Sequence, residues 1–80
     1  MKLPRDLASV ELARALAKVG YTVTRQTGSH IRLTTGQPSQ HHVTIPAHDP
    51  LKVGTLAAIV GDVAAHLELD RDELLQRLLG

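Results

Sequence analysis

The spacing of apolar residues changes twice along this 80-residue chain, and these changes limit the folds that the chain can adopt. Residues 9–19 place apolar side chains three or four positions apart, which predicts a helix with one buried face. Three shorter runs then alternate between apolar and polar residues, which predicts strands: residues 21–26, 30–34 and 42–45. Helical spacing returns in residues 55–67 and 71–79. The predicted order of elements is therefore α-β-β-β-α-α.

Local signals set the expected ends of the helices. Ser9 is the predicted N-cap of the first helix, with Asp6 as the alternative, because an N-cap oxygen can accept from a free backbone N–H. Gly20 is expected to end this helix in the left-handed conformation. Thr55 is the predicted N-cap of the second helix. Asp70 is that of the third, because a glutamate follows it at the third helical position, as in a capping box.

Parity along the strands predicts which side chains share a face of the sheet. Val23 and Leu33 are both expected on the face that the helices cover. Paired residues share a face and side chains alternate along each strand, so the two residue numbers of any pair in the first hairpin must add to an even number. A three-residue loop around Gly28 meets this condition and pairs Gln26 with His30, with the glycine in the left-handed conformation. A two-residue loop gives an odd sum and is rejected.

In the second hairpin, the simplest register sets Leu33 beside Val43. The covered face then holds five apolar residues: Val23, Ile31, Leu33, Val43 and Ile45. The opposite, open face holds polar residues: Thr22, Thr24, Gln26, His30, Arg32, His42 and Thr44. A three-stranded antiparallel sheet with helices on one face is a stable layer arrangement, so the predicted fold class is α+β.

Composition limits the classes of function. The chain has no cysteine, so it can form neither a disulfide nor a zinc–thiolate site. It has no apolar run of about 18 residues and no signal-peptide pattern, so we expect a cytoplasmic protein. Residues 1–60 carry seven Lys and Arg against three Asp and Glu, whereas residues 61–80 carry two against five. We expect one domain over residues 1–80, with residues 68–80 as a C-terminal helical extension.

Four short motifs carry a resemblance to a known family: Gly20-Tyr21, Arg25–His30, Val43–His48 and Lys52–Leu56. In this order, over roughly residues 7–67, the chain resembles the HicA toxin family, also called YcfA-like. The order α-β-β-β-α is also that of the double-stranded-RNA-binding-domain fold. The resemblance implies the toxin of a type II toxin–antitoxin pair, an endoribonuclease that cleaves mRNA without a metal or other cofactor and is neutralised by a HicB-type antitoxin.

His30 is the catalytic residue that the resemblance implies, because it is the histidine of the Gly-Ser-His motif. Its imidazole can take or give a proton near neutral pH. Cleavage of RNA can use the neighbouring 2′-hydroxyl as nucleophile, so one acid or base would contribute roughly 10²–10⁴-fold without a metal. The residues alone leave open an ordinary exposed hairpin histidine.

The other candidate RNA-binding residues lie at two turns: Gln26, Gly28, Ser29 and Arg32 in the first hairpin, and Lys52 and Thr55, with Gly54, at the start of the second helix. Arg32 shares the predicted face of His30 and can hold the scissile phosphate. A helix start offers free N–H groups to a phosphate, with simple capping as the alternative. His48 is a candidate second proton-transfer group. Arg25 falls on the covered-face parity and is expected to emerge at the sheet edge.

Several alternatives stay open at this point. A non-catalytic RNA-binding module of the same fold would bind RNA without cleaving it, and a structural partner module using its last helix would not bind RNA. The leucines of residues 74–79 fit core packing or an interface for self-association. His41 and His42 are adjacent on a strand, so they should point to opposite faces and cannot chelate one metal ion; no metal site is expected.

Overall fold

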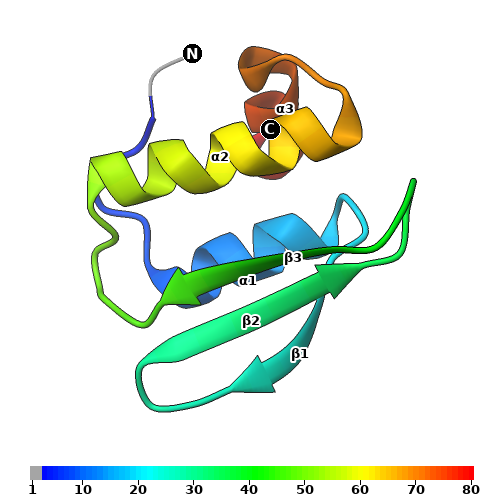
Figure 1. Ribbon diagram of the computed structural model, residues 1–80. Coiled ribbons are helices and arrows are strands. Elements are labelled where there is room, and N and C mark those ends of the chain that lie inside the picture. The colour runs from blue at the N-terminus through cyan, green and yellow to red at the C-terminus, as the bar shows by residue number, and fades with distance from the viewer. Residues whose placement is uncertain (1–2) are drawn as a thin grey trace.

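The computed structural model describes residues 3–80 and confirms the predicted order of elements. The helices lie on one side of an antiparallel sheet with the strand order β1-β2-β3 (Figure 1). The elements are α1 (Ser9–Ala17), β1 (Thr22–Gln26), β2 (His30–Thr35), β3 (His41–Pro46), α2 (Val53–Leu67) and α3 (Arg71–Leu79). This is the α+β architecture of the double-stranded-RNA-binding-domain fold with one added helix. Within residues 3–80, no helix is long and apolar enough to cross a membrane.

The hydrophobic core lies between the sheet and the helices. Ile31 and Leu33 of β2 are buried, as are Val43 and Ile45 of β3, so the predicted alternation is confirmed for both strands. Val23 of β1 is opposite Leu33, as predicted, yet 49% of it is exposed. β1 is an edge strand, and all of its residues are exposed. The core therefore depends on β2 and β3 rather than on all three strands.

The C-terminal helix α3 is part of this core. Leu74, Leu75 and Leu78 are each at most 2% exposed. Lys18 of α1 donates from its Nζ to the carbonyl oxygen of Leu78 at 3.2 Å, which ties α3 to α1. Packing is therefore the role of these three leucines, and Leu79, which is 41% exposed, is the leucine of the helix that faces solvent.

Two of the four predicted helix ends are confirmed and two are wrong. Gly20 has φ +100° and follows α1 as a left-handed residue. Asp70 accepts a hydrogen bond from the backbone N–H of the third residue of α3 at 2.7 Å. Thr55 is not the N-cap of α2, because the helix already begins at Val53. The helical hydrogen bonds start with the carbonyl oxygen of Lys52, beside the buried Leu51, so packing of the connector sets this end earlier than the local pattern predicts.

The predicted N-cap of α1 is also wrong, for a tertiary reason. Ser9 is already the first helical residue and is 2% exposed, with Ala8 at the N-cap position. The backbone N–H of Ser9 donates to Asp49 Oδ1 at 2.7 Å, across forty positions of the chain. The N–H of Ala8 donates to Glu11 Oε1 at 3.0 Å. The alternative, Asp6, does not cap the helix either, because Asp49 supplies the acceptor from the connector before α2.

The register of the second hairpin is as predicted, whereas that of the first is only partly so. Leu33 pairs with Val43 in the second hairpin. In the first, the pairing shifts between Val23 and Arg25, so that a β-bulge at Thr24 separates two regular segments. After the bulge, Arg25 pairs with Arg32 and Gln26 with Ile31. The predicted pair Gln26–His30 is therefore wrong, and every residue of β1 beyond the bulge changes face.

The turn of this hairpin depends on Thr27 rather than on glycine geometry. The N–H of Thr27 donates to the carbonyl oxygen of His30 at 2.9 Å. Its hydroxyl oxygen accepts from the N–H of Ser29 at 3.3 Å and from that of His30 at 3.1 Å. Gly28 is not left-handed, and a Cβ there would meet nothing within 4 Å. A threonine side chain that closes its own turn replaces the predicted left-handed glycine.

Candidate active site

His30 lies at the start of β2, exposed on the open face of the sheet, as parity predicts. It pairs with Pro46 at the end of β3, and the N–H of Ala47 donates to the carbonyl oxygen of Ser29 at 2.8 Å. The hairpin turn is thereby fixed to the segment that leads into α2. The turn, the end of β3 and the start of α2 lie at the same end of the molecule in Figure 1.

The ring of His30 is held by its neighbour in sequence. Ser29 Oγ lies 2.9 Å from His30 Nδ1, within hydrogen-bond distance. His30 Nε2 has no hydrogen bond to any group in residues 3–80, so this nitrogen is available to a ligand. The N–H of Gly28, beside it in the turn, is also without a partner in the described chain. The exposed turn therefore offers a ring nitrogen able to transfer a proton and a free backbone donor.

Two arginines lie on the same open face as His30. Directly paired residues of an antiparallel sheet project to the same side, so Arg25 lies on the side of its partner Arg32, two positions beyond His30. The prediction that Arg25 has covered-face parity is wrong, because the bulge moves it to the open face. The same shift sets Gln26 opposite Ile31, so it is not the cross-strand neighbour of His30.

The predicted residues at the start of α2 line a small recess. Lys52 and Thr55, with Pro46, His48 and Leu51, enclose about 210 Å³. No side chain caps the N-terminus of α2, where Lys52 is the N-cap residue. His48 Nδ1 lies 3.1 Å from the carbonyl oxygen of Pro50. A carbonyl can only accept, so Nδ1 carries the proton, and Nε2 of neutral His48 is the basic nitrogen.

The structure thus brings the two predicted turns to one end of the domain, with Pro46 as the shared residue. Pro46 both pairs with His30 and lines the recess beside His48 and Lys52. A larger hollow of about 710 Å³ lies at the opposite end of the sheet, lined by the loop after β2. None of the predicted site residues lines that hollow. In residues 3–80, no three His, Asp or Glu side chains are grouped as metal ligands.

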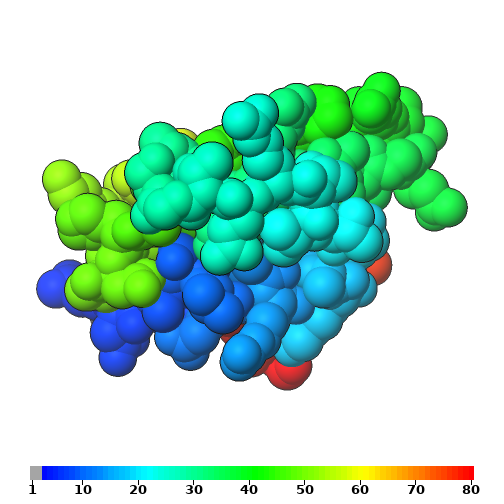
Figure 2. All heavy atoms as spheres, turned by 90° about the horizontal axis from the view of Figure 1, so that it is seen from below, coloured from blue at the N-terminus to red at the C-terminus, as the bar shows by residue number. Residues whose placement is uncertain are grey.

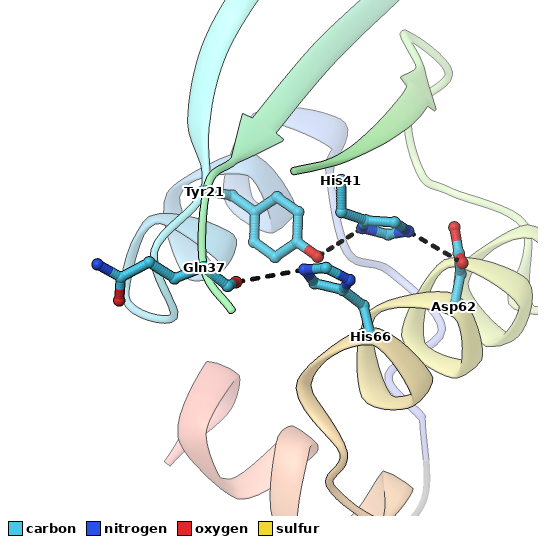
Figure 3. A network of polar contacts seen from close by, with 5 residues as sticks. All are labelled: Tyr21, Gln37, His41, Asp62 and His66. Carbon is cyan, nitrogen blue, oxygen red and sulfur yellow. Dashed lines mark hydrogen bonds and ion pairs between the residues drawn. The ribbon is translucent and has the colours of Figure 1, made fainter. Parts of the chain in front are cut away.

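A polar network joins the sheet to α2 (Figure 3). Its residue His41 begins β3, whereas His30 pairs with the last residue of that strand. The sequence patterns do not predict this network. Burial, and to a lesser degree the charge of Asp62, raises the pKa of Tyr21 to about 12. Tyr21 therefore keeps its proton and donates to His41 Nδ1 at 2.8 Å. His41 Nε2–H then donates to Asp62 Oδ1 at 3.2 Å. The rings of His41 and His66 stack with centroids 4.3 Å apart, and His66 Nε2–H donates to the carbonyl oxygen of Gln37 at 3.2 Å.

These contacts confirm that His41 and His42 point to opposite faces. His41 turns toward Tyr21 and α2, whereas His42 Nδ1 lies 2.8 Å from Thr34 Oγ1 on the open face. The network is structural, since Tyr21 is fully buried and the rings of His41 and His66 are engaged with each other.

Together, the fold and the site define a small α+β domain of the double-stranded-RNA-binding-domain type, with a histidine at an exposed hairpin turn. A family model described as the HicA toxin of bacterial toxin–antitoxin systems matches residues 9–67. The chain belongs to the HicA toxin family. It is therefore the toxin of a toxin–antitoxin pair, and its partner is an antitoxin. The match ends before α3. No curated protein and no solved structure matches the chain.

Proposed function

We propose that this toxin is an endoribonuclease that cleaves mRNA, with His30 as its catalytic acid or base. One observation supports this most: His30 has its Nδ1 beside Ser29 and its Nε2 free, on an open face that also carries two arginines without acidic partners in residues 3–80. A proton-transfer group and positive charges for a phosphate are the two things that this reaction needs.

The reaction requires no metal and no protein nucleophile. The 2′-hydroxyl of the RNA attacks the adjacent phosphorus, the bond to the 5′-oxygen breaks, and the products are a 2′,3′-cyclic phosphate and a free 5′-hydroxyl. One proton leaves the 2′-hydroxyl and one arrives at the 5′-oxygen. His30 Nε2 performs one of these transfers, which is worth roughly 10²–10⁴-fold in rate. His48, whose Nε2 is the basic nitrogen, is the candidate for the other.

The remaining site residues bind the RNA in this proposal. Arg32 holds the scissile phosphate, and the N–H of Gly28 and the hydroxyl of Ser29 donate to its oxygens. Lys52 and Thr55 bind a neighbouring phosphate at the recess before α2, where the helix start adds favourable partial charge. Gln26 would contact RNA from the tip of the hairpin, since it lies on the other side of the strand from His30.

The antitoxin, which we propose is of the HicB type, would inhibit the enzyme by burying the face that carries His30 or by distorting it. Self-association through α3, a further expectation, would have to use its exposed Leu79, because the other leucines of that helix are in the core.

A cleavage assay in the presence of EDTA tests this function. The native chain is compared with His30→Ala and with the control His42→Ala, which removes another exposed histidine from the same open face. Circular dichroism establishes that all three proteins are folded. We expect the native chain and His42→Ala to cleave mRNA and His30→Ala to lose activity by at least about 100-fold. Equal cleavage by His30→Ala would refute the assignment, and RNA binding without cleavage by any of the three would favour a binding module.

A further inference from the structure

The open face of the sheet carries no negative charge. The chain has no Asp or Glu between Glu11 and Asp49, so all three strands lack carboxylates. The acidic residues lie in the lead-in segment, in the helices and in the connectors that precede α2 and α3. The net charge of +1 is small because positive and negative side chains nearly balance over the whole chain. They are nevertheless separated in space, since the strands carry arginines and no carboxylates. The surface view in Figure 2 shows strand atoms (cyan to green) beside those of α1 (blue) on the side away from α2.

Arg25 and Arg32 are directly opposite each other on this face. Like charges at such cross-strand positions repel each other and destabilise the pair. Neither guanidinium makes a hydrogen bond or an ion pair with any group in residues 3–80, so nothing in the described chain compensates for the repulsion. A bound anion between the two side chains would do so.

The bulge at Thr24 is what produces this pair. Without the extra residue, Arg25 would lie on the other side of the strand, as regular alternation predicts. The bulge is fixed on the open face, because Thr24 Oγ1 lies 2.9 Å from Thr34 Oγ1 and donates to the carbonyl oxygen of Arg32 at 3.4 Å. Bulges commonly redirect a side chain beside an active site.

We infer that Arg25 and Arg32 together form a clamp for one phosphate of single-stranded RNA, with Arg25 as an additional substrate-binding residue. Two guanidinium groups can each donate two parallel hydrogen bonds to phosphate oxygens. Arg32 follows His30 by two positions in β2, so the backbones of these two residues are about 6.6 Å apart along the strand. The clamped phosphate is therefore the scissile one or its immediate neighbour, and the RNA strand runs from the turn of His30 onto the sheet. This inference rests on the proposed function for the identity of the ligand.

Binding, rather than cleavage, tests the clamp. The affinity of the His30→Ala protein for a short fluorescent single-stranded RNA is measured by anisotropy at several salt concentrations. Arg25→Gln is introduced into this background, with Arg25→Lys as the conservative variant. The control is Arg14→Gln, which removes the same charge from the exposed surface of α1. Because His30 is already replaced, a failure of the cleavage proposal does not affect this measurement.

We expect Arg25→Gln to weaken RNA binding about tenfold or more and to lower the slope of log affinity against log salt by about 0.7. Arg25→Lys should retain part of the affinity, because lysine keeps the charge but loses the fork. Arg25→Gln and Arg32→Gln should be non-additive when combined, since both act on one phosphate. An Arg25→Gln effect no larger than that of Arg14→Gln would overturn the clamp, as would strictly additive effects of the two arginine variants.

Discussion

We expect the hydrogen bond between Ser9 and Asp49 to be important for the stability of this domain, so that a single substitution at Asp49 destabilises it. Asp49 Oδ1 accepts the N–H of Ser9 at 2.7 Å, and the N–H of Leu51 donates to the carbonyl oxygen of Leu7 at 2.8 Å. These two bonds attach the connector before α2 to the start of α1. The Asp49→Ala substitution removes the first bond while leaving the second in place.

The expected loss follows from the burial of the N–H group. Replacing a capping side chain by alanine costs about 0.5–2 kcal/mol. Ser9 is only 2% exposed, so water does not readily replace the lost acceptor, and a buried donor without a partner costs about 1–3 kcal/mol. Both ranges describe the same bond and are not added, so we expect Asp49→Ala to destabilise the protein by about 2 kcal/mol. For a domain of this size, that lowers the melting temperature by about 10 °C.

Urea denaturation followed by circular dichroism measures this difference against two further variants. Asp49→Asn keeps an acceptor oxygen at the same position and should recover most of the stability. Asp6→Ala removes the carboxylate that sequence patterns offer as a helix cap but that forms no hydrogen bond or ion pair in residues 3–80; this variant should stay within about 0.5 kcal/mol of the native chain. If Asp49→Ala is as stable as Asp6→Ala, or if Asp49→Asn is as unstable as Asp49→Ala, the Asp49 acceptor does not stabilise α1.

Two further predictions concern the buried tyrosine. Tyr21→Phe keeps the ring but removes the donor to His41 Nδ1, so we expect a loss of about 1 kcal/mol in urea denaturation; an unchanged midpoint would contradict this. The pKa of Tyr21, about 12 in the folded chain, exceeds its ordinary value of 10.0. The folded state therefore holds the proton more tightly, and stability should fall by up to about 2–3 kcal/mol as pH rises from 10 to 12. Tyr21 is the only tyrosine, so tyrosinate absorbance reports its titration directly, and Tyr21→Phe should lack this component of the pH dependence.

The amino-acid pattern predicts much of this fold because it reflects local geometry. Alternation places Ile31 and Leu33 on the covered face, and the simplest register of the second hairpin predicts the pairing of Leu33 with Val43. Gly20 and the N-cap residue Asp70 mark helix ends correctly, since both signals depend on a backbone conformation within a few residues. The exposed position of His30 follows from the same parity argument.

The first hairpin shows where parity fails. A single extra residue at Thr24 changes the face of all later positions in β1, and alternation contains no signal for it. The turn does have a local signal in the sequence. A threonine at the start of a turn can accept hydrogen bonds from backbone N–H groups that follow it, as the Thr27 hydroxyl does from two of them. Alternation predicts neither the bulge nor this turn, so it places Arg25 on the covered face, away from His30 and Arg32.

The order of the elements, the buried faces of β2 and β3 and the exposed histidine follow from the amino-acid pattern, because each depends on periodicity or on neighbouring residues. Three other features become visible only in the packed chain: Asp49 caps α1, Tyr21, His41 and Asp62 form one network, and Arg25 faces the same side as His30. These contacts join residues distant in sequence or depend on one irregular residue. Their partners become neighbours only when the whole chain has packed.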